Sequence, residues 1–339
     1  EDYRVPGWTL ADGQVVQELG SGVYLQERQD EVVETPVELW LALEQAAVNC
    51  EPVEWLTFAH HSAYEVPQQT DWWAAENEPL KEQVVEIYSE HGSSECQDLE
   101  LEGCTWRINE GNGYVETGSI QAALSRGFRL GFVAGSDSHD ARPGSIEDGP
   151  GPVGHWEDTD GDGEVDTAMR QFTSGGLTGV WLQGDLSEAS LLEAVAARQT
   201  VATSGIRPLL KINARGRGGK RFLMGEDIPP SALPLTLSAW TVLPDWEGQV
   251  TTERIGPGGV VEDSQTGENY TGIWDPQGES WTYLRMRYIA PDGSEERVWV
   301  SPWFTDGPEA AACGCSNSVP GGKASWCLIL GTILLGILR

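Results

Sequence analysis

The stretch "LGFVAGSDSHD", residues 130–140, leads from a short apolar run into a polar tip that carries Asp137 and His139. In an extended segment, residues two positions apart point to the same side, so both side chains can face one metal ion. A carboxylate and an imidazole together suit zinc, manganese or iron. The same tip could instead be a polar turn that closes a buried strand, and the Asp-x-His spacing alone does not decide between the two.

Two other apolar runs end in the same way. The run "EWLTFA" (54–59) leads into His60 and His61, and the run "QVVEIY" (83–88) is followed by His91. Four of the five histidines therefore lie at the ends of three predicted strands. Because the carboxyl ends of parallel strands meet at one edge of a sheet, we expect these side chains to surround shared metal ions. The predicted metal ligands are His60, His61, His91, Asp137 and His139.

Helical segments separate these strands. Helix signals include Thr35 as an N-cap, Pro36 at the first helical position and Gly127 as a C-cap. The predicted elements are helices at 35–48, 119–127 and 187–199 and strands at 54–59, 83–88, 130–135, 176–183 and 200–205. This alternation of strands and helices predicts an α/β architecture with parallel strands, closing near residue 206.

The hydrophobic pattern of the sequence changes after residue 206. Segments such as "LPLTLSAW" and "WTYLRMRYIA" alternate apolar and polar residues, and "PDGS" (291–294) supplies a turn, as in a β-sandwich. From residue 305 onward the chain is rich in small residues and then becomes apolar. The predicted domains are an α/β domain at 1–206, a β-sandwich domain at 207–304, a linker at 305–325 and a hydrophobic tail at 326–339.

The charge balance narrows the range of partners. The chain has 53 acidic and 21 basic residues and a net charge of −32, which repels phosphate backbones, so nucleic acid is not an expected partner. Such a surface suits solubility outside the cell or attraction of cations, although it could be only a solvated surface.

The six cysteines match no zinc-finger spacing. Cys96 and Cys104 flank a short polar loop and could form a disulfide in an oxidising compartment. In a reducing compartment they would remain thiols.

The carboxyl-terminal segment carries an apolar run of 13 residues, Trp326 to Leu338, closed by Arg339. This run is too short for an ordinary membrane-spanning helix, and it follows the small-residue stretch "AACGCSNSVPGGKAS" (311–325). The order resembles the myxobacterial-type sorting tail of exported proteins. That resemblance implies export to the cell envelope or outer surface, with membrane contact only through the tail. The alternative is a partly buried terminal helix.

Three motifs also resemble a known family. They are "FAHHSAY" (58–64), "VEIYSEHGSSE" (85–95) and "AGSDSHDARPG" (134–144). In this order they resemble the polymerase and histidinol phosphatase (PHP) superfamily of metal-dependent hydrolases, and most closely its CehA/McbA-type branch, over about residues 30–304. The resemblance implies a PHP-like, distorted β/α barrel. It also implies hydrolysis of small phosphoester or related ester substrates by metal-activated water.

The resemblance assigns roles to individual residues. It implies that His61, His91, Asp137 and His139 are metal ligands, and that His60 is either a ligand or a neighbour that orients the site. Glu86 is expected to support the ligands rather than to bind metal directly. Arg142 could hold an anionic group of the substrate or form a surface salt bridge.

The chain departs from the family at its start. Members of the family open with an H-x-H motif, followed by another His and a Glu, and no histidine precedes His60 here. Either the chain is a fragment of a longer protein, in which two or three zinc, manganese or iron ions are expected, or it is a degenerate relative with a depleted site.

A second ion site is suggested by "DTDGDGEVD" (158–166). Asp158, Asp160, Asp162 and Asp166 occupy positions 1, 3, 5 and 9 of a calcium loop. Position 12 is Met169, where an EF-hand needs a bidentate Glu. The segment could bind calcium weakly outside the cell, or it could be a flexible acidic insertion.

Three functional hypotheses follow. The first is an exported, envelope-anchored metal-dependent hydrolase. The second is a catalytically degenerate, surface-anchored binding module that works through its β-sandwich. The third is a carbohydrate- or matrix-binding β-domain with an accessory calcium loop.

Overall fold

The chain forms two compact units in the computed structural model, residues Glu1–Val53 and Glu54–Arg339. The structure describes residues 8–9, 15–18, 23–24, 40, 56–64, 70, 72, 82–101, 103–104, 106–108, 113–137, 175–278 and 280–306. In the first unit, β1 (Trp8–Thr9), β2 (Val15–Glu18) and β3 (Val23–Tyr24) form an antiparallel sheet. Trp40 is helical, and the rest of the helix predicted at 35–48 lies outside the described residues.

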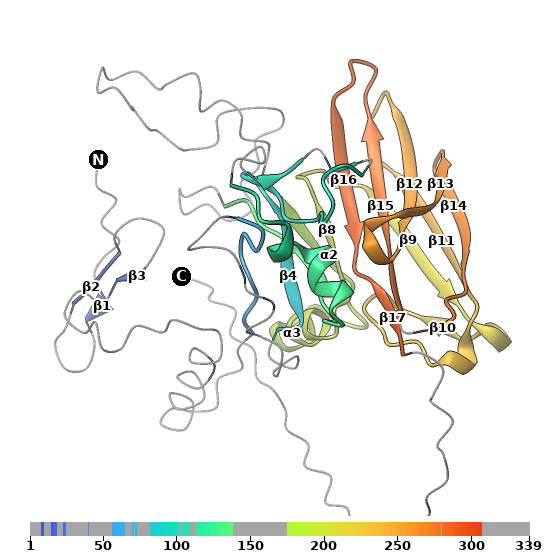
Figure 1. Ribbon diagram of the computed structural model, residues 1–339, viewed down its shortest axis with the longest axis horizontal. Coiled ribbons are helices and arrows are strands. Elements are labelled where there is room, and N and C mark those ends of the chain that lie inside the picture. Colours follow the sequence, from blue (N-terminus) through green and yellow to red (C-terminus); the bar gives the residue numbers. More distant parts are fainter. Residues whose placement is uncertain are drawn as a thin grey trace, which may run out of the picture. The chain divides into compact units, whose positions relative to one another are not determined.

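The second unit is built mainly from strands (Figure 1). Its described strands and α-helices are β4 (Val84–Ser89), β5 (Gly92–Ser93), α2 (Ile120–Ser125), β6 (Gly131–Ala134), β7 (Leu177–Val180), α3 (Glu188–Ala196), β8 (Thr200–Thr203), β9 (Leu209–Arg215), β10 (Arg221–Phe222), β11 (Leu235–Val242), β12 (Gln249–Ile255), β13 (Val261–Thr266), β14 (Asn269–Trp274), β15 (Ser280–Ile289), β16 (Glu295–Val300) and β17 (Trp303–Thr305). They form a sheet in the order β5-β4-β6, a sheet in the order β10-β9-β11-β14, and a sheet containing β13-β12-β15-β16-β8-β7. Strand β17 pairs with β15 and completes this last sheet, which has seven strands and which we call the central sheet.

The predicted α/β fold with a PHP-like barrel is wrong. The described part of the second unit is β-rich, its sheets close into no barrel, and β4 and β6 are the only named strands that pair in parallel. The strand predicted at 200–205 corresponds to β8, which pairs antiparallel with both β7 and β16. A pairing partner almost a hundred residues away leaves no local signal, so the repeated strand and helix pattern was misleading.

The same pairing bears on domain organisation. Strand β8 precedes residue 206 and β16 follows it, and the two share one sheet. The domain boundaries drawn from the sequence remain predictions, and the tail at 326–339 lies outside the described residues. None of the described helices is long and apolar enough to cross a membrane.

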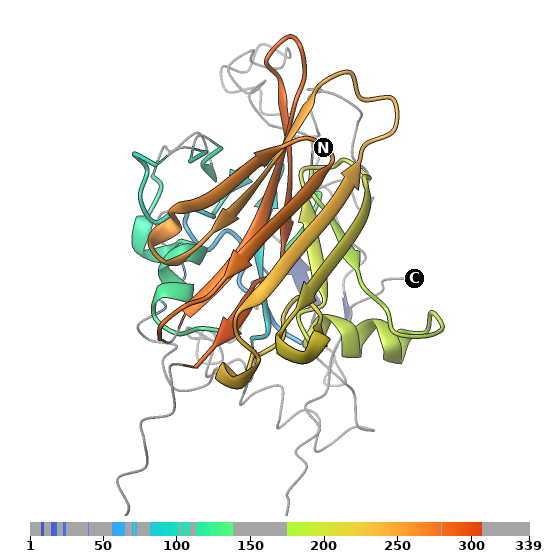
Figure 2. The ribbon, with the colours of Figure 1, turned by 90° about the vertical axis from the view of Figure 1, so that its right-hand side faces the viewer.

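Strands β15 and β16 are buried on both faces. On one face, Leu284 and Met286 pack with Val298 and with the inner side chains of the four-stranded sheet, such as Leu237. On the other face lie aromatic side chains that pack against β4, α2 and β6; these are Trp281, Tyr283 and Trp299. Alternate residues of one strand point to opposite faces, so each strand serves two cores. The seven-stranded sheet therefore lies between the four-stranded sheet and the part of the chain that carries the predicted site (Figures 1 and 2).

A buried charge cluster holds this second core together. The Glu95 carboxylate accepts hydrogen bonds from Arg285 Nη1 (3.0 Å), from the Tyr283 hydroxyl (2.6 Å) and from Trp299 Nε1 (2.9 Å). Arg285 Nε also donates to Glu253 Oε2 over 2.7 Å. Glu95 and Arg285 are each 1% exposed, so both charges depend on these partners rather than on water.

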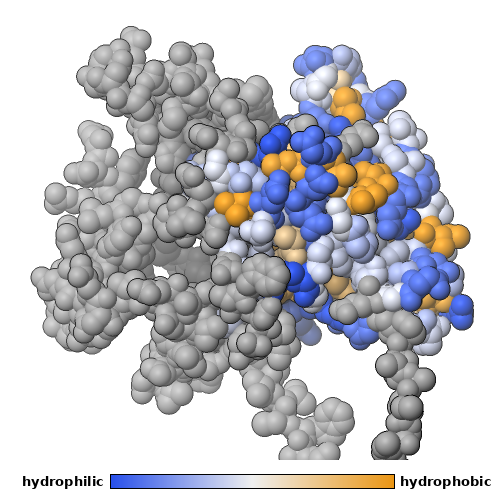
Figure 3. Space-filling model, in the orientation of Figure 1, coloured by the Kyte–Doolittle hydropathy of each residue, from blue (hydrophilic) through white to orange (hydrophobic). Residues whose placement is uncertain are grey.

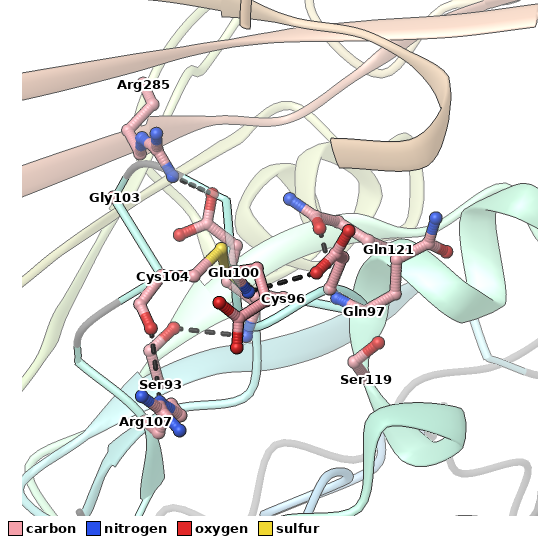
Figure 4. The surroundings of a disulfide bond; sticks show 12 residues. Ser93, Cys96, Gln97, Glu100, Gly103, Cys104, Arg107, Ser119, Gln121 and Arg285 are labelled. Atoms are coloured by element: carbon pink, nitrogen blue, oxygen red, sulfur yellow. Dashed lines mark hydrogen bonds and ion pairs between the residues drawn. A yellow bond between two sulfur atoms is a disulfide. The ribbon is translucent and has the colours of Figure 1, made fainter. Parts of the chain in front are cut away.

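A disulfide closes the segment that follows Glu95. Cys96 and Cys104 are bonded, and both are buried (Figure 4). Gly103 lies against Arg285 in the same view: its φ is +86°, and a Cβ atom there would lie 2.3 Å from an Arg285 nitrogen. The Gly103 carbonyl accepts a hydrogen bond from Arg297 Nη1 over 2.6 Å. The disulfide loop is therefore attached to the central sheet at both of these arginines.

We predict that Glu95→Gln lowers the free energy of unfolding by about 3 kcal/mol, because it leaves Arg285 buried with only part of its compensating charge. Denaturant unfolding at neutral pH measures this change. Asp306→Asn is the matched control, since the exposed Asp306 pairs with the partly exposed Arg129, which keeps its second partner Asp227, and it should cost less than about 1 kcal/mol. Equal losses in the two variants would contradict a special role for the buried cluster.

We also predict that removing the disulfide costs about 2–3 kcal/mol, the loop-entropy contribution of a bond that joins residues eight positions apart. Unfolding of the Cys96→Ser, Cys104→Ser double variant measures it. A reductant should lower the stability of the wild-type protein by a similar amount and leave the variant unchanged. A reductant that destabilises both proteins equally would show that another feature is responsible.

Candidate metal centre

The carboxyl ends of two parallel strands form the base of the candidate site. Strand β4 runs parallel to β6, so His91 and Asp137, which follow them, lie at the same edge. The segment before His60 runs alongside β4, through a parallel bridge between Thr57 and Glu82 and a hydrogen bond from Glu86 N to Ala59 O. The structure brings the polar tips of these three segments together at His60, His61, His91 and Asp137, and their role as metal ligands stays a prediction.

Three imidazole rings converge on one carboxylate oxygen. Asp137 Oδ2 lies 2.9 Å from His61 Nε2, 3.3 Å from His91 Nε2 and 3.6 Å from His60 Nε2. The rings of His60 and His61 are stacked with centroids 3.6 Å apart, and His91 meets His61 edge-on at 5.0 Å. His61, His91 and Asp137 are largely buried, whereas the His60 side chain is 47% exposed. The cluster therefore opens to solvent on the side of His60.

Glu86 is the second carboxylate of the cluster. It lies on β4, is buried, and its Oε1 is 2.8 Å from His60 Nδ1 and 3.8 Å from His61 Nε2. When a neutral His60 donates from Nδ1 to Glu86, its Nε2 carries the lone pair and faces the centre of the cluster. This carboxylate–imidazole arrangement is the usual way in which a protein orients a histidine ligand.

The spacing of the donor atoms fits a metal ion. Ligand atoms of His60, His61 and Asp137 all lie within 4.8 Å of one another. Two atoms bonded to one zinc ion at about 2.1 Å, in tetrahedral geometry, lie about 3.4 Å apart. The nitrogen–oxygen distances of 2.9 to 3.6 Å around Asp137 Oδ2 bracket this value. The mixture of imidazole and carboxylate donors suits zinc, manganese or iron.

Two of these residues adopt an unusual backbone conformation. His61 has a φ of 53° and Asp137 a φ of 52°, in the left-handed region that few non-glycine residues occupy. Such conformations are kept where the surrounding structure enforces them, most often at functional sites. Both side chains reach the cluster from this backbone conformation.

Charges within the cluster shift its pKa values. Burial alone would raise the pKa of Asp137, but the hydrogen bond from His61 and the charges of the three histidines lower the pKa to about 2. Burial alone would lower the pKa of His60, but the hydrogen bond and charge of Glu86, with the charge of Asp137, raise the pKa above its usual value of 6.5. The carboxylate is therefore ionised at neutral pH, and a proton on His60 competes with a metal ion.

Several predicted residues lie outside the described residues. These are His139, Arg142, Asp158, Asp160, Asp162 and Asp166. The closing Asp-x-His pair is thus observed only at Asp137, and the calcium site remains a prediction.

The structure also adds residues for which the sequence carries little signal. Ser89 Oγ lies 3.1 Å from His61 Nε2 and accepts a hydrogen bond from His91 N, and the fully buried Glu90 has Oε1 3.8 Å from His91 Nε2. Glu86, expected to support the ligands, lies 2.8 Å from His60 Nδ1 and 3.8 Å from His61 Nε2, which suits that supporting role. The signal for Glu86 was an acidic residue within an apolar strand.

Part of the chain around Asp137 is similar to a known family. Residues 119–222 match a family described as "Protein of unknown function (DUF3604)". The matched range contains α2, β6, Asp137 and the β7–β8 pair. No curated protein and no solved structure matches the chain. The chemistry of the site is therefore inferred from its geometry.

We predict that the full chain binds one or more zinc or manganese ions, and that His61→Ala or Asp137→Ala weakens this binding at least about tenfold by removing a ligand. Isothermal titration with each metal alone measures the affinity. Asp185→Asn, which removes an exposed carboxylate outside the cluster, should bind like the wild-type protein. Unchanged affinity in both cluster variants would show that the metal binds elsewhere.

Metal affinity should also rise with pH. Three imidazoles must be neutral to bind an ion. Because the pKa of His60 is raised above its usual value of 6.5, this ring keeps its proton to a higher pH than a free histidine does. We therefore expect the apparent zinc affinity to increase between about pH 6 and pH 8, with release of protons on binding. Titrations in buffers of different ionisation enthalpy measure the number of protons released. An affinity that does not change over this range would contradict ligation by these histidines.

Proposed function

We propose that this protein is a metal-dependent hydrolase of the PHP type that acts on small phosphoester or related ester substrates. The observation that carries the proposal is the convergence of His60, His61 and His91 on Asp137 Oδ2 at the edge where two parallel strands end. The order of the histidine motifs along the chain supports it. The complete site would include His139 and hold two or three ions.

The residues of the cluster would prepare the site for this chemistry. Asp137 faces three rings, and Glu86 fixes the orientation of His60, the ring that meets solvent. Ser89 links His61 to the backbone of His91, so one hydroxyl positions groups from two segments of the cluster. The exposed side of the cluster leaves room for a substrate to approach from the side of His60. A bound zinc, manganese or iron ion would lower the pKa of a water molecule and stabilise negative charge on the substrate oxygen.

The charge of the chain limits the substrate. A net charge of −32 repels large anions at long range, so a small ester or phosphoester that carries little charge is favoured over a polyanion. Arg142 would bind an anionic group of such a substrate. Placement outside the cytoplasm, in the cell envelope, is part of the proposal, and the Cys96–Cys104 disulfide supports it because disulfides persist in oxidising compartments.

We predict that the zinc- or manganese-loaded full chain hydrolyses bis(4-nitrophenyl) phosphate or 4-nitrophenyl acetate. Asp137→Ala and His139→Ala should each lower kcat/KM by at least about a hundredfold, because each removes a metal ligand. Release of 4-nitrophenolate measures turnover, and a chelator should abolish it. Asp185→Asn is the control and should keep its activity.

Two results would overturn the proposal. Turnover that survives both ligand substitutions would place the chemistry elsewhere in the molecule. Metal binding without turnover of either substrate would favour a metal-binding module that is not a hydrolase of this kind.

A further inference from the structure

The segment from residue 207 to residue 221 is basic, although the chain as a whole is strongly acidic. It contains six of the 21 basic residues and neither Asp nor Glu, whereas an even spread would place about one basic residue there. These six are Arg207, Lys211, Arg215, Arg217, Lys220 and Arg221. Every exposed Lys or Arg side chain in the described part of the protein belongs to this segment, and the other described arginines are buried or half-buried.

The fold spreads this segment over one face of the four-stranded sheet. In β9, Lys211 and Arg215 point outward while Ala214 points into the core, as the alternation of a strand requires. Strand β10 returns antiparallel and places Arg221 directly opposite Arg215. Arg217 and Lys220 lie in the turn between these strands. At the strand rise of about 3.4 Å per residue, Lys211 and Arg215 stand about 14 Å apart on this face.

The rest of the outer face carries polar, aromatic and aliphatic side chains. On the neighbouring strand β11, Trp240 lies beside Lys211, Ser238 beside Asn213 and Thr236 beside Arg215. The Lys211 ammonium is 5.1 Å from the centre of the Trp240 ring. Strand β14 adds Thr271 and Ile273 beyond them. None of the residues of β9, β10, β11 and β14 is acidic. We call this surface, on the outward side chains of these four strands, the basic face.

The basic face is the side of the four-stranded sheet that is turned away from the central sheet. Figure 2 shows the four-stranded sheet facing the viewer, with its inner side against the seven-stranded sheet. Figure 3 shows the side of the molecule seen in Figure 1, where hydrophilic side chains cover much of the described surface and apolar ones lie among them. The basic face combines its charged and hydrogen-bonding groups with two exposed apolar side chains, Leu209 and Ile273.

Two positively charged side chains, Arg215 and Arg221, lie next to each other on the basic face. Arg215 and Arg221 occupy directly opposite positions on neighbouring strands, an arrangement that destabilises a sheet unless an anion lies nearby. Within the described residues, the structure shows no ion pair to either of them, and the acidic residues Glu268 and Asp275 lie in the loops at the two ends of β14 rather than on the face. A guanidinium group binds a carboxylate through two parallel hydrogen bonds, so such a pair suits an anionic ligand.

The chemistry between the basic residues indicates the kind of ligand. Hydroxyl and amide groups of Ser238, Thr236 and Asn213 can bind the hydroxyl groups of a sugar, and the half-buried Trp240 offers an amphipathic ring. A nucleic acid carries a far denser charge, which the net charge of −32 opposes at long range. Screening within about 8 Å at physiological salt leaves the local positive charge able to act on a polymer that carries one carboxylate per sugar and touches the face.

We propose that the basic face binds an acidic polysaccharide, whose carboxylates pair with Lys211, Arg215 and Arg221 while its hydroxyls contact the serine, threonine and asparagine side chains between them. This inference does not depend on the metal centre. It would place the enzyme's substrate site and its attachment to a carboxylate-bearing glycan on different surfaces of the chain.

The test is binding of the full chain to polygalacturonate, with neutral dextran and a dT oligonucleotide as comparison ligands. We expect the wild-type protein to bind polygalacturonate, not dextran, and to bind less well as salt is added. The triple variant Lys211→Gln, Arg215→Gln, Arg221→Gln should lose at least about tenfold in affinity and show a shallower salt dependence. The control Gln183→Glu, Gln249→Glu, Ser264→Glu lowers the net charge equally at exposed positions outside the four-stranded sheet and should bind within about twofold of wild type.

A second variant separates sugar contact from charge. Trp240→Ala should weaken polygalacturonate binding while leaving the salt dependence unchanged, because it removes no charge. Absence of wild-type binding, equal loss in the triple variant and its control, or unchanged affinity in both the triple variant and Trp240→Ala would overturn the proposal. Tighter binding to the dT oligonucleotide than to polygalacturonate would also overturn it, and would assign the basic face to nucleic acid.

Discussion

The fully buried pairing of Glu95 with Arg285 is the interaction on which the rest of the second unit depends. Glu95 belongs to the segment that follows His91, whereas Arg285, Tyr283 and Trp299 belong to the central sheet. A carboxylate without water must keep all of these donors, so the segment can dock in only one position. That position fixes where β4 ends and hence where His91 stands relative to Asp137.

The candidate metal centre follows the same physical rule on a smaller scale. Its carboxylates, Asp137 and Glu86, are buried, and the groups that compensate their charge are the imidazoles of His60, His61 and His91. A divalent ion can take over this compensation, since the same nitrogen and oxygen atoms are already spaced as ligands. The arrangement differs from the Glu95 cluster in one respect that matters for function: His60 leaves it open to solvent, whereas the Glu95 cluster is closed.

The two faces of the central sheet divide structural and functional roles. One face packs against the strands that carry the metal centre, and the other against the four-stranded sheet, whose outer surface is the basic face. Strands β15 and β16 contribute alternate side chains to both cores. Removing the layer on either side would therefore expose the apolar side chains of these strands that face it. The basic face and the metal centre are therefore parts of one folded unit, although their side chains suit different ligands, an anionic polymer and a metal ion.

The sequence by itself determined which residues could meet at the site. The apolar runs before His91 and Asp137 marked the ends of β4 and β6, whereas the run before His60 forms only a bridge at Thr57 within the described residues. Local alternation marked the strands of residues 209–305, because this signal comes from neighbours in the chain. Only the tertiary structure decided that β8 pairs with β16 instead of continuing a parallel sheet, that Glu86 pairs with His60, and that the basic residues share one face. These outcomes depend on contacts between residues far apart in sequence, whose energies no local pattern records.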